Sequence, residues 1–358
     1  MLALVAQPGV PHSTSVADVP EVRARDGQVV IRVLEIGVCG TDREISDGLF
    51  GVPPEGKETL VLGHELLGVV ERDGNGFSRG DLVTATVRRS CSRCIACHEG
   101  SPDSCLTGDY SERGITRLDG FAREVVAEDP AQLIVIPPSL GRLGVLAEPA
   151  SICARGIRHA RTIGGRQPWE PQRALVIGAG AIGMLSTYLL RLAGLDVWTA
   201  AREPVSDPRA GLVAACGARY VSTTDEPLLA LREEVGGFDL VVEATGNAQV
   251  MAASIGMLRR NGVACLLGID PRKQAVELDG RVIGVDAILE NRVVFGSVNA
   301  HPVDWLSAVQ ALDRARERWP DALREFLDLC VPLDRFAEAF DHTGVKATLV
   351  LAEERVDR

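Results

Sequence analysis

A glycine-rich turn between an apolar run and a helical pattern is the feature that most constrains this fold. The apolar run ALVI (174–177) leads into G-A-G-A-I-G, and the helical period IGMLSTYLLRLAG follows. Glycine at these spacings permits a tight turn, lets the backbone approach a pyrophosphate and allows close packing of helix on strand. The N-terminus of the helix adds N–H donors and partial positive charge. This context predicts a dinucleotide-binding turn, with a purely structural turn as the alternative, at Gly178, Gly180, Ala181, Ile182 and Gly183.

The segments after this turn alternate apolar runs with helical periods. LDVWTA (195–200) and FDLVVEATG (238–246) read as strands, and GVACLLGI (262–269) and RVVFGSV (292–298) can add further strands to the same sheet. Strands that alternate with helices indicate a parallel sheet with helices on its faces. The sequence therefore predicts an α/β dinucleotide-binding domain over residues 153–298.

The first part of the chain has a different pattern, with short strands joined by turns. QVVIRVLEIGVC (28–39) is a β-rich run, and residues 66–85 read as two strands around a Gly/Asp/Asn turn. The chain ends in another β-prone run, ATLVL (347–351), which needs a sheet to join. We expect this strand to return to the first domain, which would then consist of residues 1–152 and 299–358.

Composition narrows the classes of partner. The 358 residues are 46% hydrophobic and 24% charged, which is typical of a globular protein of about two domains. Lys and Arg total 38 against 49 Asp and Glu, so the net charge of −11 gives no general attraction to nucleic acid. The sequence shows neither a long apolar segment nor a secretory signal, so we expect a cytoplasmic protein without membrane partners.

Four of the nine cysteines crowd into one short segment, C-S-R-C-I-A-C-H-E-G-S-P-D-S-C. This spacing lets one loop place four thiolates around a tetrahedral zinc ion, and a site with four protein ligands has a structural role. The alternatives are an iron–sulfur cluster or reduced surface thiols. The predicted ligands of this structural zinc are Cys91, Cys94, Cys97 and Cys105.

A second set of metal-ligating residue types is dispersed along the chain. Cys39 lies in V-C-G-T-D, His64 and Glu65 lie in G-H-E, and Glu148 lies in L-A-E-P. Three protein ligands and an open position make a catalytic zinc site. Spacing alone cannot gather these residues, and a lone histidine among apolar neighbours is more often a hydrogen-bonded core residue. A catalytic zinc at this set remains one of two readings of the residues.

The choice of dinucleotide depends on the segment TAAREP. Rossmann domains that bind NAD usually place a carboxylate about 20 residues beyond the glycine turn, where it accepts the ribose 2′-hydroxyl. Arg202 stands there, 19 residues after Gly183, and a guanidinium suits a 2′-phosphate. This favours NADP over NAD, although Glu203 follows directly and a solvated surface arginine is the alternative reading. Use of both NADP and NAD remains open.

Taken in order, VCGTD, GHELLG, the four-cysteine loop, LAEP and GAGAIG resemble the zinc-containing medium-chain dehydrogenase/reductase superfamily. Within it, the chain is most similar to the archaeal-type glucose 1-dehydrogenases. VCGTDREI (38–45), SERGITRLDGFARE (111–124), LAEPAS (146–151) and GSVNAH (296–301) carry that similarity. The resemblance spans nearly the whole chain and implies a GroES-like β-domain with a Rossmann doubly wound parallel-sheet domain.

The resemblance also assigns roles in a catalytic site. It implies catalytic zinc ligation by Cys39, His64 and Glu148, with Glu65 as an adjacent or alternating ligand. Thr41 matches the hydroxyl residue that hydrogen-bonds the substrate oxygen and starts its proton towards solvent. Zinc would lower the pKa of the coordinated hydroxyl, so that hydride can leave its carbon.

Further residues match positions that contact sugar or dinucleotide in this family. Glu112 and Asn299, together with Glu148, match positions at the sugar. Some members have an acidic residue where Ile152 stands, so the resemblance implies no contact with the sugar at this position. The dinucleotide positions implied by the resemblance, besides Arg202 and the glycine turn, are Thr245, Gly268, Ser297 and Asn299.

The implied activity is oxidation of a glucose-like aldose at C1 to its lactone, with NADP or NAD as acceptor and two zinc ions per chain. One alternative is a dehydrogenase of another polyol or of an amino-cyclitol. Another, from a different class, is a non-catalytic dinucleotide-binding sensor. Proteins that lose catalysis usually lose metal ligands as well, whereas here every ligand position keeps a residue that can bind a metal. Relatives are commonly dimers or tetramers, which implies a homo-oligomer.

Overall fold

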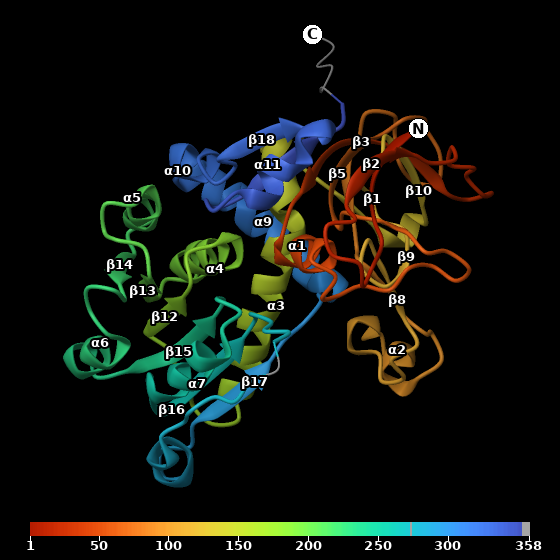
Figure 1. Cartoon of the computed structure of the whole chain (residues 1–358). Coiled ribbons are helices and arrows are strands. Elements are labelled where there is room, and N and C mark those ends of the chain that lie inside the picture. Colours follow the sequence, from red (N-terminus) through yellow and green to blue (C-terminus); the bar gives the residue numbers. More distant parts are fainter. Residues whose placement is uncertain (273, 353–358) are drawn as a thin grey trace. The chain divides into compact units, whose positions relative to one another are not determined.

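The computed structural model describes residues 1–272 and 274–352, which form two compact units (Figure 1). Unit 1 contains Met1–Glu148, Asn299–Asp313 and the described residues from Leu327 onward, and unit 2 contains Pro149–Val298 and Arg314–Phe326. The units differ from the predicted domains in two segments, residues 149–152 and 314–326, which both belong to unit 2.

Both differences have a packing reason. Residues 149–152 lie inside helix α3 (Ala147–Gly164), which runs without a break past the predicted boundary. In the second segment, the rings of Trp319 and Phe326 pack edge-on against Tyr188, at centroid distances of 5.2 and 4.8 Å. Aromatic contacts of this kind tie the segment to the Rossmann-like unit rather than to the β-domain.

Unit 1 is built on a seven-stranded sheet. Its order is β11-β6-β5-β3-β19-β18, and β10 also pairs with β3. The predicted return of the last strand is confirmed, since β19 pairs antiparallel with β3. The strands are β3 (Val29–Gly37), β5 (Glu65–Val70), β6 (Leu82–Ala85), β10 (Val125–Glu128), β11 (Leu133–Val135), β18 (Leu329–Pro332) and β19 (Ala347–Val350).

Smaller elements complete unit 1. Two three-stranded sheets have the orders β2-β1-β4 and β7-β8-β9. Their strands are β1 (Leu2–Ala6), β2 (Ser15–Asp18), β4 (Leu60–Val61), β7 (Arg88–Arg89), β8 (Ser111–Arg113) and β9 (Arg117–Leu118). The helices are α1 (Gly40–Ser46), α2 (Ile95–His98), α9 (Pro302–Arg318), whose last turn belongs to unit 2, and α11 (Phe336–Asp341), with short 3-10 turns at Pro102–Ser104, Pro130–Gln132, Pro138–Leu146 and Leu333–Arg335.

Strand β3 contributes several side chains to the core of unit 1. Its burial is continuous over the last five residues, because the sheet is covered on both faces there. Ile31, Val33 and Ile36 of β3 join one apolar cluster with Phe121 and with Leu349 of β19. β3 ends at Gly37, two residues before Cys39, and Val38 between them belongs to the same cluster.

Unit 2 confirms the predicted parallel sheet. The order is β14-β13-β12-β15-β16-β17, with every pair parallel, which is the doubly wound arrangement. Its strands are β12 (Arg173–Ile177), β13 (Asp196–Ala201), β14 (Arg219–Ser222), β15 (Phe238–Glu243), β16 (Leu258–Leu266) and β17 (Val293–Gly296). Its helices are α3, α4 (Ala181–Leu192), α5 (Pro208–Ala215), α6 (Leu228–Val235), α7 (Ala248–Gly256), α8 (Ala287–Leu289) and α10 (Pro320–Arg324), with a π-turn at Val282–Asp286.

One strand boundary in unit 2 differs from the prediction. The apolar run places the start of the fifth strand at Gly262, but β16 begins at Leu258. The pairing moves from Phe238 opposite Leu258 to Leu240 opposite Val263, so the polar residues between form a bulge. Asn261 takes a positive φ of 63° in this bulge. A periodicity argument cannot see a bulge, because the extra residues break the alternation it relies on.

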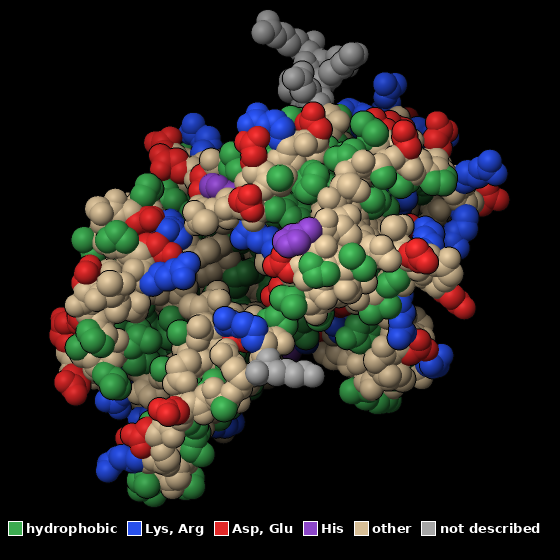
Figure 2. Space-filling model, in the orientation of Figure 1, with side chains coloured by type: hydrophobic (Ala, Val, Ile, Leu, Met, Phe, Trp, Pro, Cys, Tyr) green, Lys and Arg blue, Asp and Glu red, His purple; other side chains and the backbone are tan. Residues whose placement is uncertain are grey.

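On the face shown in Figure 2, acidic and basic side chains are interspersed, with hydrophobic side chains between them. No helix in the described part of the chain is both long enough and apolar enough to cross a bilayer.

Candidate active site and metal centres

Three of the predicted metal ligands meet at one end of the central pair of strands in unit 1. Cys39 follows the end of β3, and His64 and Glu65 lie at the start of β5, where Gly37 pairs with Glu65. The ligand atoms of the three residues all lie within 4.8 Å of one another. The Cys39 Sγ lies 3.0 Å from the His64 Nε2. The antiparallel pairing of β3 with β5 therefore brings Cys39 to two ligands that lie 25 or more residues further along the sequence.

Cys39 is also the N-cap of helix α1. Its Sγ accepts a hydrogen bond of 3.2 Å from the backbone N–H of Thr41, and its own N–H donates to the Asp42 carboxylate at 3.0 Å. The hydrogen bond from Thr41 fixes the direction of the Cys39 side chain, which places its sulfur as a possible metal ligand beside the helix N-terminus. Thr41 is placed two residues beyond Cys39, on the first turn of the helix.

Asp42 has a further contact that the sequence motifs do not predict. Its buried Oδ1 lies 3.5 Å from the Nδ1 of His64, while the Nε2 of that ring points at Cys39. Burial raises the pKa of Asp42, but the charge of the nearby His64 ring and the hydrogen bond from the Cys39 N–H lower it by more, so the pKa of Asp42 is below its usual value. The carboxylate thereby orients the imidazole with Nε2 towards the ligand group.

The electrostatics of this group favour a bound cation. Burial lowers the pKa of His64, yet the charges of Cys39 and Asp42 raise it well above its ordinary value. A buried set of anions around one imidazole is stabilised by a positive charge, either a proton or a metal ion. Thiolate, imidazole and carboxylate are the donors that zinc prefers, so the residues fit a zinc ion.

Glu148, on the first turn of α3, belongs to the same electrostatic environment. Burial raises its pKa to about 7, the charge of Glu65 adds to that rise, and the charges of His64 and Lys346 oppose it. The group of mutually close ligand atoms nevertheless contains Glu65 rather than Glu148. Ligation of zinc by Glu148 therefore stays a prediction, with Glu65 as the carboxylate that this structure brings to Cys39 and His64.

Lys346 is a buried cation that the sequence analysis did not single out. Its Nζ forms an ion pair with the Glu65 Oε2 and donates a hydrogen bond of 2.9 Å to the carbonyl of Val38. A Cβ at Gly37 would lie 2.0 Å from that Glu65 oxygen, so only glycine leaves room for the pair. The lysine competes with any metal ion for the carboxylate of Glu65.

The four clustered cysteines also converge. Their Sγ atoms lie within 4.8 Å of one another, with 3.4 Å between Cys94 and Cys97 and 3.8 Å between Cys91 and Cys97. A disulfide requires about 2.05 Å, so these are separate thiols. The backbone N–H of Leu106 lowers the pKa of Cys94, and a hydrogen bond with the Thr107 hydroxyl lowers that of Cys105 to about 6.

The segment that carries these thiols has little apolar support. Helix α2 buries no residue, and the side chains of Ile95 and Leu106 are exposed. A loop without a core of its own is stabilised when four thiolates share one metal ion. The donor set fits a structural zinc, as the spacing predicts.

The glycine turn of unit 2 has the geometry expected of a dinucleotide site. Gly178 has a φ of 111°, which other residues rarely adopt, and a Cβ on Gly183 would lie 1.9 Å from the Gly178 carbonyl oxygen. Gly180 is the N-cap of α4, no side chain caps that helix, and a Cβ there would meet open space. The N–H groups of Ala181 and Ile182 thus start a helix whose end is open to an anion.

Arg202 follows the end of β13. Its side chain is 88% exposed and lies 3.3 Å from Glu203, which also lies 3.4 Å from Arg209. The charge of Glu203 is therefore shared between two arginines, which weakens its opposition to a phosphate at Arg202.

The other predicted dinucleotide residues follow strand ends of the same sheet. Thr245 follows β15, and its N–H donates to the Glu243 carboxylate at 2.7 Å. Gly268 follows β16 and lies so close to Gly246 that a Cβ on it would be 2.3 Å from the Gly246 nitrogen. Ser297 follows β17 and donates its N–H to the Leu266 carbonyl at 3.1 Å. These positions lie at the carboxyl edge of a parallel sheet, where such folds bind ligands.

Of the predicted sugar contacts, Glu112 lies on β8 and Asn299 lies in unit 1 directly before α9. The Glu112 carboxylate forms an ion pair of 2.9 Å with Arg88. Asn299 has a positive φ of 66° and lines a cavity together with Arg88 and Ser90. Both residues therefore lie near Arg88, a residue that no sequence motif identifies.

Comparison with known families matches both parts of the chain. The model for the alcohol dehydrogenase GroES-like domain matches residues 25–138, and the model for the glucose dehydrogenase C-terminus matches residues 141–351.

Individual proteins are similar over the full length. A glucose 1-dehydrogenase of Methanocella arvoryzae is 40% identical over 342 residues, which cover 94% of this chain and 95% of that protein. Glucose 1-dehydrogenase 1 of Caldivirga maquilingensis is 39% identical, with 98% of each chain covered. Among solved structures, Haloferax mediterranei glucose dehydrogenase in complex with NADP, Zn and gluconolactone has a TM-score of 0.90 at 30% identity, covering 99% of this chain and 100% of that one.

Proposed function

The chain belongs to the glucose dehydrogenase family of zinc-containing medium-chain dehydrogenases, and on that premise we propose that it oxidises a glucose-like aldose at C1 to the aldonolactone. The hydride acceptor is NADP, with NAD as a weaker substitute. The observation that carries the proposal is the convergence of a cysteine sulfur, an imidazole and a carboxylate within 4.8 Å, beside helix α1, whose first turn holds Thr41.

Two zinc ions per chain are proposed. The catalytic ion is held by Cys39, His64 and a carboxylate, which is either Glu148 or Glu65, and the structural ion is held by the four clustered cysteines. A zinc ion bound at the first site would supply Lewis acidity, which would lower the pKa of the sugar hydroxyl and stabilise the developing negative charge. Asp42 keeps the imidazole oriented for this ligation.

The chain's own residues account for the proton and for orientation. The Thr41 hydroxyl would accept the proton of the C1 hydroxyl and pass it outward. A bound NADP would accept the C1 hydrogen together with the electron pair of the broken C1–H bond. A carbonyl forms at C1, which makes the product a lactone. Glu112 accepts a hydrogen bond from another sugar hydroxyl, and Asn299 can donate or accept one. These contacts orient the sugar so that its C1–H bond faces the dinucleotide.

A His64→Ala variant tests the proposal. We expect one of two zinc ions per chain to be lost, aldose oxidation to fall below detection, and NADP binding to persist, because the glycine turn belongs to another unit. The exposed His98→Ala is the matched control and should retain activity. Zinc content, turnover on a panel of aldoses and polyols, and NADP titration are measured together. Turnover retained in His64→Ala would discredit the catalytic zinc, and preference for a polyol would favour that alternative substrate class.

We further propose that the chain assembles as a homodimer or homotetramer through the edge of the unit 2 sheet. β17 is the last strand of that sheet, and the nearby Ile288 and Leu289 are 68% and 67% exposed. An unpaired strand edge with apolar side chains beside it favours association with a second copy. Light scattering on the wild type and on Ile288→Lys/Leu289→Lys should show an oligomer that dissociates in the variant. A wild-type monomer would contradict this proposal.

The proposed location is the cytoplasm. All nine cysteines are free in the structure, which suits a reducing compartment, where thiolate zinc sites persist. Cell fractionation with an activity assay tests this location, and recovery of the activity outside the cytoplasmic fraction would contradict it.

A further inference from the structure

Arg88 and Glu112 are direct cross-strand neighbours. β7 and β8 pair antiparallel, with Arg88 opposite Glu112 and Arg89 opposite Ser111. Side chains that face each other across such a pair lie on the same face of the sheet and are close enough to interact. The strand register therefore fixes which arginine meets the carboxylate that is proposed to contact the sugar.

The Arg88 guanidinium is held on three sides. Its Nε and Nη2 lie 3.0 and 2.9 Å from the same Glu112 oxygen, Oε1. Its Nη1 donates a hydrogen bond of 2.7 Å to the backbone carbonyl of Asp103, in the four-cysteine loop. Its Cζ lies 3.9 Å from the centre of the Tyr110 ring. The planar fork of arginine can make these contacts at once, whereas a lysine cannot.

This arrangement leaves half of the carboxylate available. Both Arg88 nitrogens use Oε1, and among the described residues no side chain or backbone group donates a hydrogen bond to Oε2 of Glu112. The Arg88 side chain is 8% exposed and that of Glu112 is 14% exposed, so the pair is shielded from water on most sides. A shielded acceptor with a fixed direction discriminates strongly between a ligand that has a matching hydroxyl and one that lacks it.

We propose that Arg88 is a positioning residue for sugar recognition: it fixes the Glu112 carboxylate so that Oε2 accepts a hydrogen bond from one particular hydroxyl of the aldose. The inference rests on the proposed function, since it takes Glu112 as a sugar contact. The Asp103 carbonyl anchors Arg88, so the four-cysteine loop contributes to sugar selection through its backbone. In this proposal Arg88 acts through Glu112 rather than on the reacting atoms.

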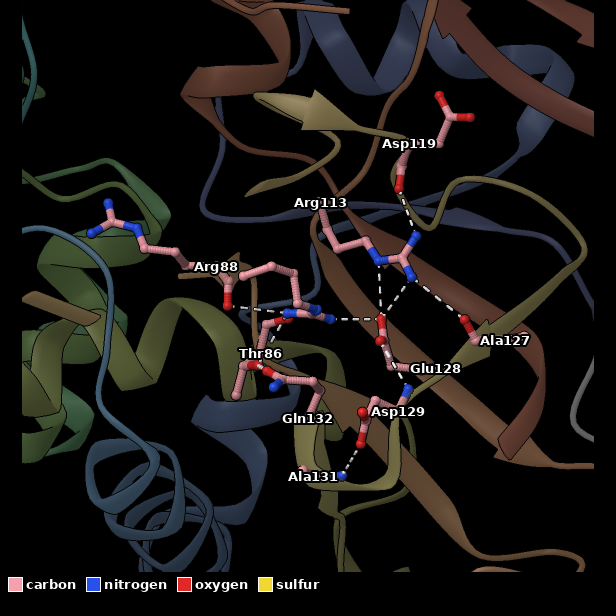
Figure 3. Close-up of polar contacts among 10 residues, drawn as sticks. Thr86, Arg88, Arg113, Asp119, Ala127, Glu128, Asp129, Ala131 and Gln132 are labelled. Atoms are coloured by element: carbon pink, nitrogen blue, oxygen red, sulfur yellow. Dashed lines mark hydrogen bonds and ion pairs between the residues drawn. The ribbon is translucent and has the colours of Figure 1, made fainter. Parts of the chain in front are cut away.

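The neighbouring arginine offers a matched control. Figure 3 shows the Arg88 side chain pointing away from Glu128, whereas Arg113 faces that carboxylate. Arg89 and Arg113 both form ion pairs with the buried Glu128 carboxylate, at 2.6 and 2.9 Å. Arg89 lies on the same strand as Arg88 and forms a comparable ion pair, and among the described residues its hydrogen bonds and ion pair go to Thr86, the Arg88 carbonyl and Glu128 rather than to Glu112.

The experiment compares Arg88→Met, Glu112→Gln, their double variant and Arg89→Met. Kinetics are measured with glucose and with 2-, 3-, 4- and 6-deoxyglucose at saturating NADP. We expect Arg88→Met to raise the KM for glucose about ten- to a hundredfold, as for loss of a hydrogen bond to a charged group, with kcat within about threefold. One deoxy sugar, poor for the wild type, should be no poorer than glucose for Arg88→Met and for Glu112→Gln.

The double variant should be no worse than Glu112→Gln alone, because both changes remove one interaction. Arg89→Met should lower the melting temperature and leave the KM for glucose and the deoxy profile unchanged. Arg88→Lys keeps the charge and should fold even if Arg88→Met does not, and we expect its KM for glucose between those of wild type and Glu112→Gln.

The possible failures are distinguishable. A wild-type KM and deoxy profile in both Arg88 variants, with both altered in Glu112→Gln, would overturn the role of Arg88 alone. A wild-type profile in Glu112→Gln would overturn the Glu112 contact and the inference with it. Absence of any aldose oxidation by the wild type would overturn the proposed function itself.

Discussion

At the residue scale, Asp42 connects two parts of the candidate metal centre, because it binds the Cys39 N–H at 3.0 Å and lies 3.5 Å from the His64 Nδ1. We expect Asp42→Asn to lower zinc affinity and kcat/KM about 10–100-fold, since an amide orients the imidazole less well. Competition with a zinc chelator and steady-state kinetics measure the two effects. Asp47→Asn, at the exposed end of the same helix, should change neither. Equal effects of both substitutions would contradict the orienting role.

Arg202 provides the test of cofactor choice. We expect Arg202→Ala to raise the KM for NADP about tenfold or more and to leave that for NAD within about twofold, because only NADP carries the 2′-phosphate. Glu203→Gln should shift the ratio the opposite way, since it removes a negative charge 3.3 Å from the guanidinium. Parallel losses with both dinucleotides in Arg202→Ala would show that this arginine does not read the phosphate.

Motifs predict residues better than they predict contacts. Cys39, His64 and Glu65 were identified from VCGTD and GHE, and the structure brings them together. Lys346 could not be predicted, because its partner Glu65 is far away in sequence and only the pairing of β19 with β3 makes them neighbours. Arg88 was missed for a similar reason, since its partner depends on the register of two short strands.

At the scale of elements, the β12–turn–α4 segment depends on the absence of a side chain at Gly183. A Cβ there would lie 1.9 Å from a backbone oxygen, so we expect Gly183→Ala to shift the turn and weaken NADP binding about tenfold or more. Gly211→Ala is the control, since its Cβ would meet open space on exposed helix α5, and it should stabilise unit 2 by about 0.5–1 kcal/mol. Dinucleotide titration and thermal melting report both. Unchanged NADP affinity in Gly183→Ala would contradict the assigned turn.

The sequence predicts elements best where periodicity and turn chemistry agree. The strands on either side of the Gly/Asp/Asn turn, β5 and β6, are confirmed, and so are β12, α4, β13 and β15 of the predicted alternation. Strand β14, between β13 and β15 in the sequence, was not predicted. The start of β16 was wrong, because four polar or glycine residues bulge out of the ladder opposite β15. A bulge is stabilised by its surroundings rather than by a local sequence signal.

At the scale of the whole molecule, the two candidate metal centres are built from separate residue sets. We expect the wild type to hold two zinc ions per chain, Cys94→Ser to hold one and to melt at a lower temperature, and Cys330→Ser to hold two. The reason is that the Cys94 sulfur lies within 4.8 Å of three other cysteine sulfurs, whereas Cys330 is exposed and outside both groups. Metal analysis by mass spectrometry counts the ions. Two ions retained in Cys94→Ser would contradict the structural zinc.

The chain's discontinuous organisation was predictable only in outline. A lone terminal strand needs a sheet, and β19 supplies that link to the first part of the chain. The placement of residues 314–326 with unit 2 depends on the contacts of Trp319 and Phe326 with Tyr188. Neither hydrophobic periodicity nor a sequence motif predicts these contacts.

Transfer of deuterium tests the central claim most directly. The chain is incubated with glucose deuterated at C1 and with NADP, and the reduced dinucleotide is analysed by mass spectrometry and NMR. The account predicts one deuterium at the nicotinamide C4 and a slower hydride-transfer step for the deuterated sugar. Reduced dinucleotide without deuterium, or no reduction at all, would contradict it.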